Sequence, residues 1–68
     1  MANLGQKLKE LRKEQKLNQK QIAEKLNIHQ VTYQGYETNK HKPDIDTLAK
    51  IADILHTSMD YLMGRYDK

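Results

Sequence analysis

Four residues between positions 29 and 40 combine hydrogen-bonding and apolar groups at helical spacing: Gln30, Val31, Gln34 and Gly35. A glutamine amide can donate and accept hydrogen bonds, and valine offers a compact apolar surface. A glycine inside a helix costs about 1 kcal/mol relative to alanine, so its presence needs a reason. If these residues share an outer face, that face suits close contact with a partner better than contact with water, for which lysine and glutamate are the usual helix formers.

The residues able to act in catalysis or to hold a metal do not form a usable arrangement. His29, His41 and His56 share neither a helical face nor a metal-ligand spacing. Asp44 and Asp46 are more simply a helix cap and a first-turn charge than a catalytic pair. The sequence has no glycine-rich phosphate loop and no nucleophile motif. We therefore expect no enzyme activity, no bound metal, no cofactor and no small-molecule ligand.

Length and composition favour one small cytoplasmic domain with a basic first part. The 68 residues include no cysteine, so disulfides cannot support the fold and short helices must be well capped. No apolar run approaches the roughly 20 residues that cross a bilayer, and no secretory signal is present. Residues 1–42 carry nine Lys/Arg and four Glu, whereas residues 43–68 carry three Lys/Arg and five Asp. The first part is the candidate anion-facing side, although a solvated basic surface that aids solubility is the alternative.

The hydrophobic spacing predicts five short helices and no strand. Apolar residues recur at helical spacing in residues 4–15, 19–26, about 29–38, 45–55 and a last short segment after residue 58. Helix caps are expected at Asn3, Asn18, Asp44 and Ser58, and asparagines at the ends of the second and third helices suit the left-handed conformation. We therefore expect an all-α fold, a compact bundle in a single domain over residues 1–68 with its core at about 3–64.

The third helix can be oriented from its sequence. At 100° per residue, Tyr33, Tyr36 and Glu37 lie within one sector and are expected to face the other helices. Val31 and Gly35 lie on the opposite side. Gly35 is therefore expected to point outward and to remain open.

The stretch NQKQIAEKLNIHQVTYQGYETNKHKPD, residues 18–44, resembles the helix-turn-helix of the phage repressor and Cro proteins and of the wider xenobiotic-response-element-type transcriptional regulators. The shared pattern is carried here by Asn18-Gln19, Ile22-Ala23, Asn27-Ile28, Tyr36-Glu37, Asn39-Lys40 and Pro43. The segment LAKIADILHTSMDYLMG resembles the fourth and fifth helices of that family, so the resemblance covers about residues 3–64 and implies a lambda-repressor-like domain. Three residues depart from the pattern: His29 replaces a Ser or Thr cap, Tyr33 an aliphatic residue and Gly35 a longer polar one.

The resemblance implies that the third helix lies in the major groove of duplex DNA while the second crosses the phosphate backbone. Base contacts are expected from Gln30, Val31 and Gln34, because glutamine can pair with adenine and valine can pack on a thymine methyl. Gly35 would permit close approach to the bases, or would be only a weak spot in an exposed helix. Phosphate contacts are expected from Asn18, Gln19, Thr32, Thr38, Lys40 and Lys42. Asn18 could act only as a cap, and Lys20 and Lys25 could equally be solvated.

The resemblance also implies a structural ion pair between Arg12 and Glu37. The alternative is two independent surface charges. A partly buried pair would fix the first and third helices relative to each other more than it would add net stability.

As a whole, the resemblance implies a sequence-specific double-stranded DNA-binding transcriptional regulator, a repressor that occludes a promoter. A homodimer on a palindromic operator with half-sites about 34 Å apart is expected. The competing hypothesis is a protein-interaction module, such as an antitoxin or a coactivator-like adaptor, because fold alone does not exclude it. A dimer surface is expected on the last helix and the tail, where Met59, Met63 and Tyr66 could be exposed, with ordinary core packing as the alternative. Whether the chain is a whole Cro-like protein or the N-terminal domain of a longer repressor stays open.

Overall fold

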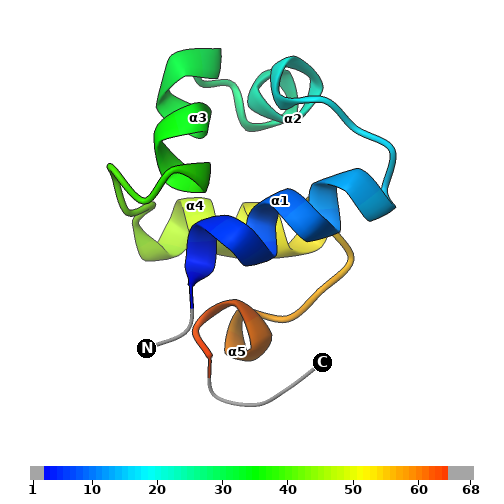
Figure 1. Cartoon of the computed structure of the whole chain (residues 1–68), viewed down its shortest axis with the longest axis vertical. Coiled ribbons are helices and arrows are strands. Elements are labelled where there is room, and N and C mark those ends of the chain that lie inside the picture. Colours follow the sequence, from blue (N-terminus) through cyan, green and yellow to red (C-terminus); the bar gives the residue numbers. More distant parts are fainter. Residues whose placement is uncertain (1–2, 65–68) are drawn as a thin grey trace.

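The structure, a computed structural model, describes residues 3–64 as five α-helices joined by turns (Figure 1). The helices are α1 (Leu4–Glu14), α2 (Gln19–Leu26), α3 (Gln30–Glu37), α4 (Ile45–Ile54) and α5 (Met59–Leu62). The described residues contain no strand, and the predicted all-α fold is confirmed. None of these helices has both the length and the apolar character needed to span a membrane. Tyr66, one of the residues expected on a dimer surface, lies outside the described residues.

Local capping explains where most of these helices begin and end. The side chain of Asn18 accepts a hydrogen bond from the backbone N–H of Gln21, whose side chain accepts one from the backbone N–H of Asn18, which completes a capping box. Asn3, Asp44 and Ser58 each accept from the backbone N–H three residues later, as predicted. α3 is the exception, because His29 makes no side-chain cap.

Left-handed residues end several of the helices. Asn27 ends α2 with φ 58°, and Asn39 follows α3 with φ 62°, so both predicted stops are confirmed. Lys16 and His56 adopt the same conformation with φ 59° and φ 56°, although neither residue type favours it. The turns after α1 and α4 were therefore not marked by the usual asparagine or glycine.

One apolar core unites the helices. Its buried members come from every helix: Leu8, Leu11, Ile22, Ala23, Leu26, Tyr33, Tyr36, Leu48, Ile51, Ala52, Leu55 and Leu62. Tyr33 is fully buried and Tyr36 is 9% exposed, so the predicted inward sector of α3 is confirmed. Their rings meet edge to face with centroids 6.2 Å apart, a favourable arrangement for two aromatic side chains.

The packing leaves one side of α3 free. In Figure 1, α2 and α3 lie at one end of the molecule, α1 and α4 cross its middle, and α5 lies at the other end. α3 packs against α2 and α1, and α5 packs against α4 and α1. The side of α3 that faces away from these two contacts is consequently the outer surface of the helix pair.

A close contact between α1 and the end of α3 was not anticipated from the sequence. Gly5 is buried, and a Cβ built on it would overlap the carbonyl oxygen of Glu37. The Gly5 N–H donates to Asn39 Oδ1 at 3.1 Å, while Asn39 Nδ2 donates to Asn3 Oδ1 at 2.9 Å. These two asparagines and the absence of a side chain at Gly5 hold the start of α1 against the end of α3.

Candidate nucleic-acid interface

The outer side of α3 carries the residues expected to contact bases. Gln30, Val31 and Gln34 are all exposed, and Val31 has 73% of its surface accessible, the largest fraction among the exposed large apolar residues of the described chain. None of these three side chains packs into the core. The structure thus offers two amides and one aliphatic group on a single free helix face, as the rotational argument predicted.

Gly35 differs from its expectation. It was expected to be open on this face, but it is buried. A Cβ built there would overlap Cδ2 of His41 and lie 3.1 Å from its Nε2, so the imidazole ring occupies the space next to the glycine. The prediction that Gly35 is open for direct approach of DNA bases is wrong, because its own chain covers it.

At the start of α2, the two residues expected to contact phosphate have internal roles. Asn18 uses its side-chain oxygen in the capping box. Gln19 turns its side chain toward the core side and donates from Nε2 to Glu37 Oε1 at 3.0 Å. This contact uses one of the two amide hydrogens of Gln19, and the expected phosphate contact stays a prediction. The first backbone N–H groups of a helix have no partner within it, so this helix start can still donate to an anion.

The two threonines expected to contact phosphate are not equivalent. Thr32 is half-buried, and Thr38 is exposed. The Thr38 hydroxyl donates back to the carbonyl oxygens of Gln34 and Gly35, at 3.1 and 3.3 Å. This hydroxyl would have to rotate away from the helix before it could donate to a phosphate.

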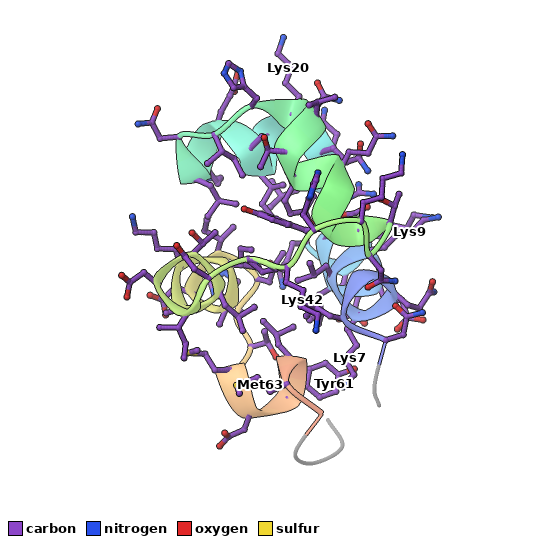
Figure 2. All side chains as sticks on the ribbon, turned by 90° about the vertical axis from the view of Figure 1, so that its left-hand side faces the viewer. Lys7, Lys9, Lys20, Lys42, Tyr61 and Met63 are labelled. Carbon is purple, nitrogen blue, oxygen red and sulfur yellow. The ribbon has the colours of Figure 1, made fainter. Side chains whose placement is uncertain are left out.

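Exposed lysines lie in the segment after α3 and at the start of α2. Lys40 and Lys42 are exposed in the segment between α3 and α4, and Lys20 is exposed at the start of α2. Figure 2 shows Lys20 projecting away from the helices. Lys7, by contrast, donates to the carbonyl oxygen of Tyr61 at 2.8 Å and lies over its ring, so this lysine joins α1 to α5. The positive charge of the first 42 residues is thus only partly available to an anion.

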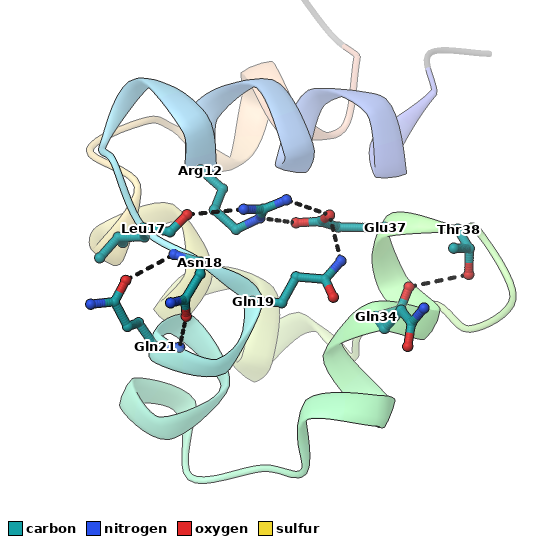
Figure 3. A network of polar contacts seen from close by, with 8 residues as sticks. All are labelled: Arg12, Leu17, Asn18, Gln19, Gln21, Gln34, Glu37 and Thr38. Atoms are coloured by element: carbon teal, nitrogen blue, oxygen red, sulfur yellow. Dashed lines mark hydrogen bonds and ion pairs between the residues drawn. The ribbon is translucent and has the colours of Figure 1, made fainter.

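A buried polar network fixes α3 to α1 (Figure 3). Arg12 Nε donates to Glu37 Oε2 at 2.6 Å and Nη2 donates to Oε1 at 3.2 Å, a two-point contact between guanidinium and carboxylate. Arg12 Nη1 also donates to the carbonyl oxygen of Leu17 at 2.9 Å. The Arg12 and Glu37 side chains are 11% and 3% exposed, so the structure forms this ion pair away from bulk water.

Burial and hydrogen bonding act in opposite directions on this network. Burial would raise the pKa of Glu37, but the hydrogen bonds from Arg12 and Gln19 outweigh it, and the pKa falls below its ordinary value. The hydrogen bond to Glu37 raises the pKa of Arg12, despite burial. The Tyr33 hydroxyl is buried near the ion pair without a well-formed hydrogen bond to any described residue. Burial, together with the nearby Glu37 carboxylate, raises the pKa of Tyr33 well above its usual range.

The lowered pKa of Glu37 predicts that the folded domain loses stability in acid. Its ionised form stabilises the folded chain above the ordinary pKa of 4.5, and this contribution is lost as the pH falls through the lower folded pKa. The free energy of unfolding of the wild type should therefore drop on acidification below about pH 4.5 more steeply than that of Glu37→Gln. Denaturant titrations between pH 2 and 7 measure this, with Glu24→Gln, an exposed carboxylate on α2, as the control that keeps the wild-type profile. Equal slopes for the wild type and Glu37→Gln would contradict the assignment.

Sequence reasoning missed His41 as a part of this surface. From the sequence, His41 is considered only as a metal ligand or a catalytic group. The glycine inside α3 was the available signal of a close approach, but which group approaches it depends on how the chain turns after Asn39. No short-range pattern contains that information.

This arrangement of five short helices is that of a known domain type. A sequence model described as helix-turn-helix matches residues 8–62, most of the chain. The chain belongs to the helix-turn-helix family. In this helix-turn-helix domain α2 and α3 are the two helices joined by the short turn at Asn27, Ile28 and His29.

Curated relatives place the helix-turn-helix domain among regulators of the phage repressor and Cro type. It is 43% identical over 63 residues to the HTH-type transcriptional regulator ImmR of Bacillus subtilis (strain 168), covering 93% of this chain and 50% of ImmR. It is 34% identical over 61 residues to the immunity repressor protein of Bacillus phage phi105, covering 90% of this chain and 42% of that protein. The chain thus spans about half the length of the curated relatives it matches. No solved structure matches it at a significant level.

Proposed function

We propose that the chain is a sequence-specific double-stranded DNA-binding transcriptional regulator that inserts the free face of α3 into the major groove. The observation that carries the proposal is the set of exposed side chains on that face, Gln30, Val31 and Gln34, on a helix held by the buried Arg12–Glu37 pair. Amides and an aliphatic group match the donors, acceptors and thymine methyls displayed by the major groove. The regulator and repressor names of its relatives support the same class of function.

In the proposed mode of binding, base contacts and phosphate contacts come from different parts of the surface. Gln30 and Gln34 hydrogen-bond to base edges, and Val31 packs on a thymine methyl. The start of α2 and the lysines after α3 face the phosphates on either side of the groove, which orient the domain without specifying sequence. Bound at a promoter, such a domain excludes other proteins from the same DNA and so acts as a repressor.

Selection of duplexes from a random pool, at one defined salt concentration, tests the proposal. We expect a shared sequence to emerge and to bind about 10³-fold or more tightly than a shuffled duplex of the same composition. Equal affinity for the selected and the shuffled duplex would contradict sequence-specific binding and would favour a protein-interaction module.

The proposal includes a homodimer on a palindromic operator. A single recognition helix offers few base contacts, and two half-sites about 34 Å apart would place two copies of α3 in successive major grooves on one side of the duplex. The selected sequence should then be palindromic, and sedimentation of the complex should give two chains per duplex. A single half-site bound by one chain at full affinity would contradict the dimer.

The lysines after α3 predict the salt dependence of binding. If Lys40 and Lys42 each neutralise a phosphate, then Lys40→Ala and Lys42→Ala should each reduce the slope of log K against log salt by about 0.9. The loss of affinity should be similar for the selected and the shuffled duplex, because phosphates carry no sequence information. Lys50→Ala, an exposed lysine on α4, is the control that should leave the slope unchanged. An unchanged slope for both loop variants would remove these lysines from the interface.

A further inference from the structure

The free face of α3 continues into a hollow that the turn after the helix helps to form. Its lining residues are Val31, Gln34, Gly35, Thr38, Lys40 and His41. Val31 and Gln34 are expected to contact bases, and Thr38 and Lys40 are expected to contact phosphate, so the hollow joins the two kinds of surface. Of the remaining residues, His41 is the one with an exposed aromatic side chain able to donate and accept hydrogen bonds.

The backbone holds His41 against the helix. The carbonyl oxygen of Gly35 accepts hydrogen bonds from the backbone N–H groups of Lys40, at 2.9 Å, and of His41, at 3.2 Å. The Thr38 hydroxyl donates to the same oxygen at 3.3 Å. Three donors on one carbonyl fold the turn back over the end of α3 and fix where the His41 side chain begins.

The imidazole ring then lies where a side chain on residue 35 would lie. The Cδ2 atom of His41 overlaps the position of a Cβ on Gly35, while Nε2 and Cγ are 3.1 and 3.2 Å from it. Because Cδ2 is the ring atom nearest to this Cβ position, the opposite edge of the ring, formed by Nδ1 and Cε1, is turned away from it. A side chain on residue 35 would displace this ring from its place against α3.

We propose that His41 is a specificity-determining residue that contacts a base edge in place of a side chain at position 35. The inference rests on the proposed function, that is, on α3 lying in the major groove. Position 35 is one helical turn after Val31 and beside Gln34, so a ring at this point lies along the same face as the expected base contacts. An imidazole N–H can donate to the N7 and O6 acceptors of guanine, which are the acceptors the major groove displays for that base. The glycine that weakens α3 is thus explained by a base contact contributed from outside the helix.

The test measures the affinity of three variants, His41→Ala, Gly35→Ala and the double variant, for the duplex selected by the wild type and for its shuffled form. We expect His41→Ala to weaken binding to the selected duplex about tenfold, with little change for the shuffled duplex. A second selection with His41→Ala should lose the preference at one base pair of each half-site. Gly35→Ala should give a similar loss, and the double variant should lose no more than either single variant, because both changes remove the same contact.

His56→Asn is the matched control, since His56 is an exposed histidine outside this face and asparagine tolerates its left-handed backbone. Thermal melts check that each variant is folded. If Gly35→Ala does not fold, His41→Ala, at an exposed position, still tests the proposal.

Unchanged affinity for His41→Ala would overturn the proposal. An equal loss on both duplexes would also overturn it, because that loss would mean a phosphate contact. Losses that add in the double variant would overturn the coupling of the two residues. If the wild type shows no preference among duplexes, the proposed function itself fails; if it shows a preference that depends on Gln30 and not on His41, only this inference fails.

Discussion

Arg12→Ala is expected to lower the free energy of unfolding by about 3 kcal/mol or more, because it leaves the Glu37 carboxylate buried without its cation. The Glu37 side chain is 3% exposed, so water cannot replace the lost guanidinium without opening the contact between α1 and α3. In a domain of this size each kcal/mol corresponds to about 4–8 °C in Tm, so thermal unfolding followed by circular dichroism should show a fall of more than about 12 °C. Affinity for the selected duplex should fall as well, since Arg12 and Glu37 fix the orientation of α3.

Two further variants separate the buried pair from a general effect on α1. Lys9→Ala, at an exposed position on the same helix, should change the unfolding free energy by less than about 0.5 kcal/mol. Replacing both partners by apolar residues, as in Arg12→Met with Glu37→Leu, should recover much of the loss, because no unpaired charge is then buried. An Arg12→Ala variant with the melting temperature of the wild type would contradict the structural role of the pair.

Gln30→Ala and Val31→Ala are expected to weaken binding to the selected duplex by about 1–3 kcal/mol each, or about 5- to 150-fold. The glutamine variant loses hydrogen bonds to a base edge, and the valine variant loses apolar contact with a thymine methyl. Both side chains are exposed in the free chain, so the melting temperature should stay close to that of the wild type. Fluorescence anisotropy with the selected and the shuffled duplex measures both affinity and specificity.

The chain offers matched controls for these two substitutions. Ile45 is 67% exposed on α4, so Ile45→Ala removes an equally accessible aliphatic side chain from another surface. Gln15→Ala removes an exposed glutamine at the end of α1. Both controls should bind the selected duplex as the wild type does. If the α3 variants also bind both duplexes as the wild type does, base recognition by this face is refuted.

The fold was predictable to the extent that local rules determine it. The capping box at Asn18 and Gln21, the cap at Asp44 and the left-handed Asn27 and Asn39 each act within a few residues, and the structure contains all of them. Apolar spacing then assigned the buried faces, including the inward tyrosines of α3. The sequence does not mark the end of α1 in this way, because Lys16 adopts a left-handed conformation that its residue type does not favour.

The parts that sequence reasoning missed depend on contacts between distant residues. The carbonyl of Glu37 leaves no room for a side chain at Gly5, and the His41 ring lies over Gly35. Gln19 was expected to face phosphate, yet its side chain completes the hydrogen bonding of Glu37, 18 residues later. In each case the sequence shows the residue type. The residue that contacts it lies far along the chain or across a turn, and only the folded structure places the two together.

The most direct measurement of the central claim is the nuclear Overhauser effect between the Val31 methyl groups and the protons of the selected duplex in the bound state. If the free face of α3 lies in the major groove, these methyls should show cross-peaks to base protons on that side of the DNA, thymine C5 methyls among them. Cross-peaks to DNA from the methyls of Ile45 or Met63, with none from Val31, would contradict it.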